Sequence, residues 1–122
     1  MIDHFNLPVG NLASSRRFYE RVLEPLELRF LMEDGDAVGF GTETWQFGIV
    51  ATQKPFPRLH LAFAASSRRA VDRFFEVATS IGARSNGSPG VRSEYDSDYY
   101  AAFVLDPDGH NIEAVCRKRG AR

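Results

Sequence analysis

The chain has 122 residues, 43% of them hydrophobic and 25% charged, which suits a single globular domain with a core of its own. Its net charge of −1 gives no electrostatic reason to expect nucleic acid or an anionic membrane surface as a partner. One cysteine excludes an internal disulfide, and neither a signal peptide nor an apolar run of about 20 residues is evident, so we expect a cytoplasmic protein without a membrane span.

The first half begins with residues 2–9, whose side chains alternate between two sets along the chain. This period of two residues predicts a strand. Asn11 is a suitable N-cap for a helix over residues 12–23, whose apolar side chains recur every three or four positions until Pro25 ends it. Three more strands are predicted, over residues 26–32, 37–41 and 45–51.

The second half repeats this order after a proline-containing linker. A strand is predicted over residues 59–65, then a helix that Ser66 and Ser67 can cap and that Gly82 ends after Ile81. Further strands are predicted over residues 83–85, 99–105 and 110–116, with a loop at residues 86–90. Each half therefore consists of a strand, a helix and three strands.

We interpret the chain as an α+β domain of two tandem βαβββ modules, because two such units bury more surface by pairing than alone. The expected boundaries follow from the breaks in the pattern. A single domain covers residues 1–122, with module one at about 1–52, a linker at 53–58, module two at about 59–117 and a basic tail at 118–122.

Three residues could together bind a metal ion. His4 and His60 occupy equivalent places in the first strand of each half, and Glu113 lies in the last strand among apolar neighbours that point the other way. Two imidazoles and one carboxylate are the pattern of an open, reactive metal site. Taken singly, each histidine is more often a hydrogen-bonded structural residue than a ligand, and Glu113 could lie in water at a sheet edge.

Several segments resemble the vicinal oxygen chelate superfamily, which includes glyoxalase I, extradiol dioxygenases, and fosfomycin- and bleomycin-resistance proteins. The resemblance extends over nearly the whole chain. Its most specific part is the Asp-Pro-Asp-Gly turn followed by a strand with a glutamate. The segments that carry it are Ile2-Asp3-His4-Phe5, Leu59-His60-Leu61-Ala62-Phe63 and residues 100–115, which read YAAFVLDPDGHNIEAV.

The resemblance implies two modules whose sheets curl around a central cavity, often completed in a homodimer. It places His4, His60 and Glu113 on the family's metal-ligand positions and implies a divalent ion, with Zn, Ni, Mn and Fe all suited to such ligands. Glyoxalase I relatives carry a fourth ligand on the last strand of module one. Here Gly48 aligns with Glu113, so three ligands are expected, with Gln46 either a weak amide ligand or a polar residue lining the pocket.

Other residues are candidates for the substrate pocket. Trp45 either covers a wall of the cavity or fills the core, and Tyr100 either hydrogen-bonds the substrate or packs. His110 has the opposite parity to Glu113 and is expected outside the site, Cys116 is expected to be buried, and Arg84 and Arg92 either hold an anionic substrate or are solvated.

We therefore expect a metal-dependent enzyme, a lyase, transferase or dioxygenase, that acts on a small oxygen-rich molecule chelated to the metal. One alternative is a metal-free module that binds a small molecule, as in bleomycin-resistance proteins. A further alternative is a domain with a vestigial site, because the fourth ligand position lacks an acid.

Overall fold

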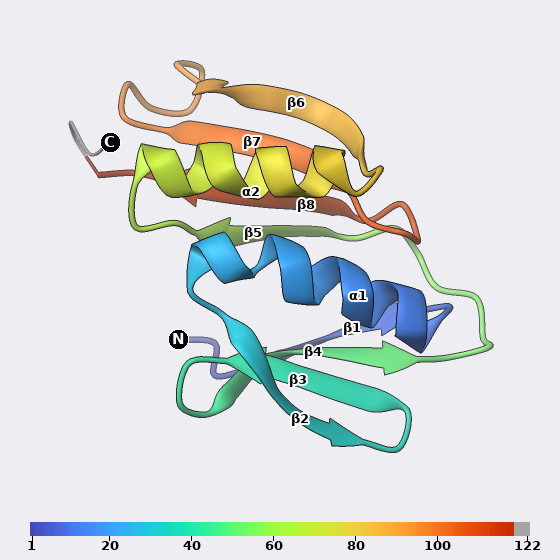
Figure 1. Ribbon diagram of the computed structural model, residues 1–122. Helices are drawn as coiled ribbons and strands as arrows, with labels where there is room; N and C mark the ends of the chain where they lie inside the picture. The colour runs from blue at the N-terminus through green and yellow to red at the C-terminus, as the bar shows by residue number, and fades with distance from the viewer. Residues whose placement is uncertain (119–122) are drawn as a thin grey trace.

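The computed structural model describes residues 1–118, and residues 119–122, which make up most of the predicted basic tail, lie outside the described residues. Two modules with the same order of elements lie one above the other (Figure 1). Module one contains β1 (Phe5–Val9), α1 (Leu12–Val22), a short 3-10 helix η1 (Glu24–Leu26), β2 (Arg29–Asp34), β3 (Ala37–Gly41) and β4 (Trp45–Ala51). Module two contains β5 (His60–Ala64), α2 (Arg68–Ser80), β6 (Arg84–Val91), β7 (Tyr100–Leu105) and β8 (Asn111–Cys116).

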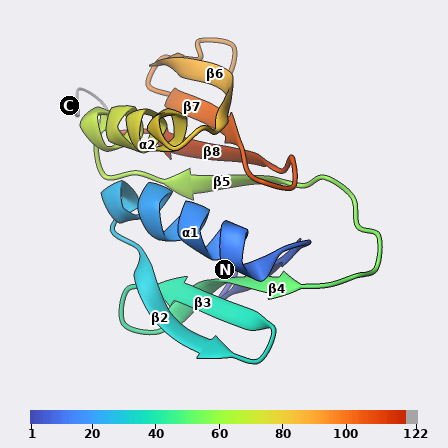
Figure 2. The same ribbon diagram turned by 45° about the vertical axis from the view of Figure 1, so that its right-hand side comes forward.

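Each module has a mixed four-stranded sheet. The strand orders are β1-β4-β3-β2 and β5-β8-β7-β6, in which the first strand of each module runs parallel to the last and the other pairs are antiparallel. The predicted α+β architecture of two βαβββ modules is therefore confirmed. Figure 2 shows that both helices lie on one side of the sheets and that the linker after β4 extends away from the sheets before β5 begins.

The helices begin where side chains satisfy their free amide groups. The Asn11 side chain accepts a hydrogen bond from the Ser14 amide at 2.9 Å, and the Ser67 hydroxyl accepts one from the Ala70 amide at 3.1 Å. Both predicted caps are thus correct. At the end of α2, Gly82 adopts a positive φ of 95°, which a residue with a side chain rarely adopts.

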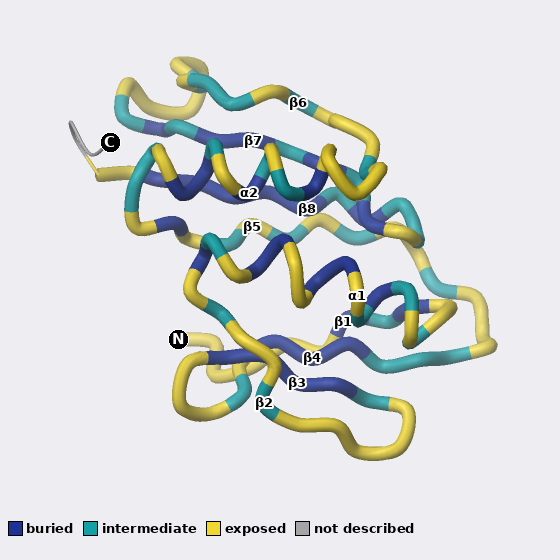
Figure 3. The backbone as a smooth tube through the Cα atoms, viewed as in Figure 1, coloured by how far each residue is buried: buried dark blue, intermediate teal, exposed yellow. Residues whose placement is uncertain are grey.

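One core joins the two modules. Tyr19 and Phe40 from module one and Phe74 from α2 are fully buried, and they belong to a continuous apolar cluster that also includes Cys116. Figure 3 shows the result in the backbone, where β3 and β8 are largely buried while β2 and β6 are mostly exposed edges. Each sheet therefore packs one face under the helices, and its other face is left for a site.

Two predicted segments differ from the structure. The expected strand at residues 26–32 starts only at Arg29, because Glu27 takes a left-handed φ of 65° after the 3-10 helix. The expected loop at residues 86–90 instead lies inside β6, with register shifts around Gly87. An edge strand needs one partner only, so it tolerates bulges, glycine and proline that a central strand would not. Among the described residues, no helix is long and apolar enough to cross a membrane.

Candidate metal centre

His60 and Glu113 meet on the open face of the second sheet. β5 and β8 are parallel neighbours, and Ala62 is the register partner of Glu113. His60 and Ala62 share a face, so the imidazole reaches the carboxylate, and His60 Nε2 lies 3.0 Å from Glu113 Oε1. The Glu113 side chain is only 2% exposed, whereas that of His60 is 50% exposed. The pair thus combines a buried carboxylate with a half-exposed imidazole ring.

The hydrogen bond on the other side of the His60 ring determines which nitrogen carries a proton. His60 Nδ1 lies 3.1 Å from the backbone carbonyl of Asn111, which can only accept, so Nδ1 is the donor. In neutral His60, Nε2 then presents a lone pair to the carboxylate of Glu113. Two acceptors 3.0 Å apart repel each other unless a proton or a cation lies between them. A metal ligand held through its second nitrogen is the usual arrangement in metalloproteins.

Tyr99 holds the other oxygen of Glu113. Its hydroxyl donates a hydrogen bond to Glu113 Oε2 from the residue just before β7. Burial, and then the hydrogen bond and charge of Glu113, raise the pKa of Tyr99 to about 12, so the phenol keeps its proton at neutral pH. Tyr99 packs with Ala101, Val115 and Phe103 in a small apolar cluster on this face. The alternation of side chains along β7 could have identified Tyr99 from the sequence, because Tyr99 has the same parity as Phe103, the register partner of Glu113.

His4, by contrast, does not join this pair. It precedes β1, is exposed, and its Nδ1 lies 2.8 Å from Asp3 Oδ1. Its ring centroid is 4.5 Å from that of Trp45. Within residues 1–118, the group of three side chains with all ligand atoms within 4.8 Å of one another is a different one, so His4 does not approach both His60 and Glu113 that closely.

The three pocket candidates lie in different places. Gln46 and His60 line the same hollow of about 470 Å³, although the Gln46 amide oxygen accepts from the Thr42 amide at 3.3 Å. Trp45 is half-buried beside His4. Tyr100 belongs to the helix side, where its hydroxyl donates to Asp72 Oδ1 on α2 at 2.6 Å, so it is not brought together with Glu113.

The register shows what occupies the fourth ligand position. Gly48 pairs with Asn6 in module one, just as Glu113 pairs with Ala62 in module two, so Gly48 is the equivalent of Glu113. His4 lies two residues before Asn6 and His60 two before Ala62, so the two histidines are also equivalent. A Cβ atom on Gly48 would clash with Asn6 Oδ1 and lie 3.4 Å from the Trp45 ring. Module one therefore offers no acid at this position, and the Trp45 indole covers part of its open face.

A second cluster of metal-type side chains lies at the turn between β7 and β8. Asp106, Asp108 and His110 have ligand atoms within 4.8 Å of one another. Asp106 Oδ2 accepts from the Tyr19 hydroxyl at 2.6 Å, and Asp106 Oδ1 accepts from the amides of Asp108 and His110, both at 2.9 Å.

Both ring nitrogens of His110 are also occupied. Nδ1 accepts from the Leu59 amide at 2.9 Å, and Nε2 donates to the Pro8 carbonyl at 2.8 Å. Asp108 Oδ1 accepts from the Gly10 amide at 3.0 Å. Asp108 Oδ2 is buried without a partner, but a metal ion bound by His110 would have to break one of its two ring hydrogen bonds. The cluster is therefore better explained as a joint between the modules. His110 accordingly lies outside the His60–Glu113 face, as its parity predicts.

The fold and the paired side chains of the open face are consistent with one family of proteins. The profile of the Glyoxalase/Bleomycin resistance protein/Dioxygenase superfamily matches residues 1–114, so the chain is a member of that superfamily.

Individual relatives agree with this assignment. An uncharacterized protein, YqjT of Bacillus subtilis (strain 168), is 29% identical over 124 residues, which cover 93% of this chain and 97% of that protein. The crystal structure of a glyoxalase/bleomycin resistance protein from Albidiferax ferrireducens T118 superposes with a TM-score of 0.81 at 27% identity, covering 95% of this chain and 98% of the other. The fosfomycin resistance protein FosX from Mesorhizobium loti shares the fold, with a TM-score of 0.71, 20% identity, and 98% and 93% coverage.

Proposed function

We propose that the protein is a metal-dependent enzyme that acts on a small oxygen-rich molecule, with His60, Glu113 and His4 as the metal ligands. The observation that carries the proposal is the opposition of His60 Nε2 and Glu113 Oε1 at 3.0 Å. That separation suits two ligand atoms that each lie about 2.1 Å from one ion. Nitrogen and carboxylate ligands suit Zn, Ni, Mn and Fe alike.

The surrounding residues prepare the pair for this role. The Asn111 carbonyl accepts a hydrogen bond from His60 Nδ1, so in neutral His60 the lone pair is on Nε2, where it can bind a metal. Tyr99 occupies Glu113 Oε2 and leaves Oε1 directed at His60. A bound divalent ion would supply Lewis-acid stabilisation of negative charge on a substrate oxygen. Module one has no equivalent acid, which leaves coordination positions for the neighbouring oxygens of a substrate.

Metal content tests the ligand assignment directly. Protein purified without added metal is analysed beside His60→Ala and beside Glu76→Gln, which removes an exposed carboxylate on α2 as a control. We expect a divalent metal in the unaltered protein and in Glu76→Gln, and its loss in His60→Ala. Equal metal in all three proteins would refute the assignment.

His4 does not lie beside His60 and Glu113 of its own chain, so we propose a homodimer in which His4 of one copy completes the site of the other. His4→Ala and His60→Ala chains are unfolded together, refolded as a mixture and analysed for metal. If His4 of one copy completes the His60–Glu113 site of the other, mixed dimers regain one intact site, about a quarter of the full metal content. If all three ligands come from one chain, the mixture stays empty.

A metal-free binding module is the second candidate, and the hollow beside His60 favours it. Ile2, Phe5, Phe47, Leu61 and Phe63 give this hollow a largely apolar lining. The single tryptophan, Trp45, reports on nearby binding through its fluorescence. Quenching by bleomycin in excess EDTA would support this candidate, whereas quenching by fosfomycin only after metal is added would support the enzyme. Neither response would be expected from a vestigial site.

A further inference from the structure

Arg92 lies on the open face of module two, on the same side of the sheet as His60 and Glu113. Its guanidinium carbon is 5.3 Å from the centre of the Phe103 ring, and the centre of the His60 ring is 6.1 Å from that same point. Phe103 is also the register partner of Glu113. One aromatic ring therefore has both the guanidinium group and the imidazole of the proposed metal site as neighbours.

Backbone groups hold this guanidinium group in place. Arg92 Nη1 donates to the Gly90 carbonyl at 2.9 Å, and Nη2 donates to the Ser88 carbonyl at 2.7 Å. A Cβ atom on Gly87 would lie 3.2 Å from Nη2, and one on Gly90 would lie 3.2 Å from Nη1. The two glycines of β6 thus leave the space that the guanidinium group fills.

No ion pair balances the charge of Arg92 in the described chain, residues 1–118, where the arginines within 4.0 Å of a carboxylate oxygen are Arg16 and Arg73. Arg92 is half-buried, and a half-buried charge without a counter-charge costs free energy. The backbone carbonyls of its loop need donors rather than a charge. A guanidinium group also has more N–H donors than these two bonds use. The charge and the remaining donors are therefore available to a ligand.

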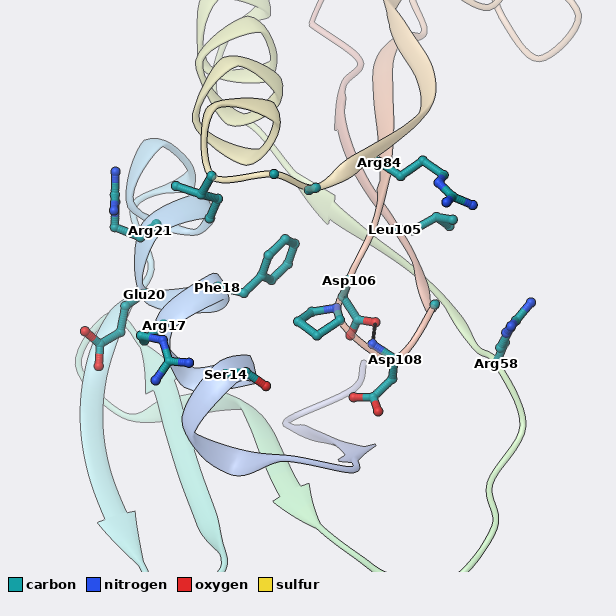
Figure 4. Close-up of a pocket in the computed structure, with 15 residues that line it drawn as sticks. Ser14, Arg17, Phe18, Glu20, Arg21, Arg58, Arg84, Leu105, Asp106 and Asp108 are labelled. Atoms are coloured by element: carbon teal, nitrogen blue, oxygen red, sulfur yellow. Dashed lines mark hydrogen bonds between the residues drawn. The ribbon is translucent and has the colours of Figure 1, made fainter.

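The arginines on the helix side of the molecule are arranged differently. Arg17, Arg21, Arg58 and Arg84 line a hollow of about 850 Å³ between α1 and the turn after β7. All four are exposed, and Figure 4 shows them at opposite margins of this hollow. Of the two arginines that the sequence offers for an anionic substrate, Arg84 and Arg92, the one with a contact to the open face is therefore Arg92.

The strand register gives the distance between the metal pair and the guanidinium group. Glu113 pairs with Phe103 on β7, and Phe103 pairs with Gly87 on β6. Neighbouring strands lie about 4.8 Å apart, so Gly87, beside the guanidinium group of Arg92, is about 10 Å from Glu113 across the sheet. The apolar cluster around Phe103 lies between them. A ligand that reaches both ends needs an apolar body about as long as one aromatic ring.

We propose that Arg92 binds an acid group of the substrate and so determines the substrate class. The substrate is an organic acid whose carboxylate is separated from its metal-binding oxygens by an apolar body. The oxygens lie at His60 and Glu113, the body rests on Phe103, and the carboxylate pairs with the guanidinium group. The inference rests on the proposed function, because the oxygens are held by the metal.

The probe is 4-carboxybenzohydroxamate, whose hydroxamate chelates a metal through two neighbouring oxygens and whose carboxylate lies at the far end of the ring. Its neutral match is 4-carbamoylbenzohydroxamate. Each is titrated calorimetrically into the full-length, Zn²⁺-loaded protein, into Arg92→Gln, and into Arg69→Gln, which removes an exposed charge on α2. We expect the acid to bind about tenfold more tightly than the amide to the unaltered protein and to Arg69→Gln.

In Arg92→Gln this advantage of the acid should disappear, while the affinity for the amide stays the same, which also shows that the variant is folded. An acid that binds no better than the amide, or that keeps its advantage in Arg92→Gln, would overturn the inference.

The variant His60→Ala and protein treated with EDTA separate this inference from the proposed function. Loss of both probes in His60→Ala, with no Arg92-dependent preference in the unaltered protein, means that the metal site is correct and the role of Arg92 is wrong. An Arg92-dependent preference that persists in His60→Ala and in EDTA means that Arg92 binds the acid group and that the metal site is wrong. Binding of neither probe to the unaltered protein overturns both.

Discussion

Module two carries two clusters of metal-type side chains, and they differ in what their atoms already do. At the β7–β8 turn, both oxygens of Asp106 and both ring nitrogens of His110 have protein partners. On the open face, His60 Nε2 and Glu113 Oε1 face only each other. The turn also has an unpartnered oxygen, Asp108 Oδ2, so the two clusters differ in the histidine: both nitrogens of His110 are bound to backbone groups, whereas His60 Nε2 faces a carboxylate.

The largest effect is expected from Asp106→Ala. It leaves the buried Tyr19 hydroxyl and two backbone amides without their acceptor, so we expect it to lower the free energy of unfolding by about 3–5 kcal/mol. Urea unfolding measures this loss. Asp108→Ala removes one bond to Gly10 and should cost about 1 kcal/mol. A folded Asp106→Ala or Asp108→Ala protein that loses its metal would show that the turn, not the open face, binds it.

Glu113→Gln, by contrast, should weaken metal binding without lowering the stability of the fold. It removes a proposed ligand charge and should weaken metal binding by more than about 100-fold, beyond what loss of a supporting residue causes. Stability should be unchanged or higher, because a buried charge without metal opposes folding. Calorimetric titration with Zn²⁺ and Ni²⁺ measures the affinity, and thermal unfolding of the metal-free protein measures the stability. Undiminished affinity would remove Glu113 from the site.

A smaller effect is expected at Tyr99. Tyr99→Phe frees Glu113 Oε2 while keeping the ring in its apolar cluster, so metal affinity should fall by roughly tenfold. The same titration measures it, with Tyr95→Phe, at an exposed tyrosine, as the matched control. An affinity equal to that of the control would show that Tyr99 does not position Glu113.

The smallest effect concerns Tyr100, which points to the helices instead. Burial, and then Asp72, raise its pKa from 10.0 to about 12, so folding favours the protonated phenol. Its contribution is fully present below pH 10 and is lost as the pH rises through 12. Tyr100→Phe should therefore cost about 1 kcal/mol at pH 8 and less at pH 11, by urea unfolding, with metal affinity unchanged. A cost that stays constant with pH would contradict the Tyr100–Asp72 assignment.

The sequence predicts most of the fold because its signals are local. Asn11 and Ser67 cap the predicted helices, and the alignment of Gly48 with Glu113 agrees with the register of β4 and β8. Alternation alone also indicates that His60 and Glu113 can share a face.

The rest depends on contacts between distant segments. The side chains of Asp106, Asp108 and His110 find partners 87, 98 and 102 residues away, respectively, at Tyr19, Gly10 and Pro8. The position of His4 depends on Asp3 and Trp45. Strand parity distinguishes Tyr99 from Tyr100, because it gives the face of each residue. It does not give the distance between two elements, so it could not separate His4 from the pair.

The turn that joins the modules also has a consequence for synthesis of the chain on the ribosome. Tyr19, Gly10 and Pro8 emerge early, yet their hydrogen-bond partners lie at residues 106–110. Until those residues leave the exit tunnel, the first module has a hydroxyl, an amide and a carbonyl without protein partners, and the buried Tyr19 hydroxyl alone costs about 1–3 kcal/mol. Module one is therefore expected to reach its final stability only after residues 106–110 have left the exit tunnel, so its folding is coupled to that of module two.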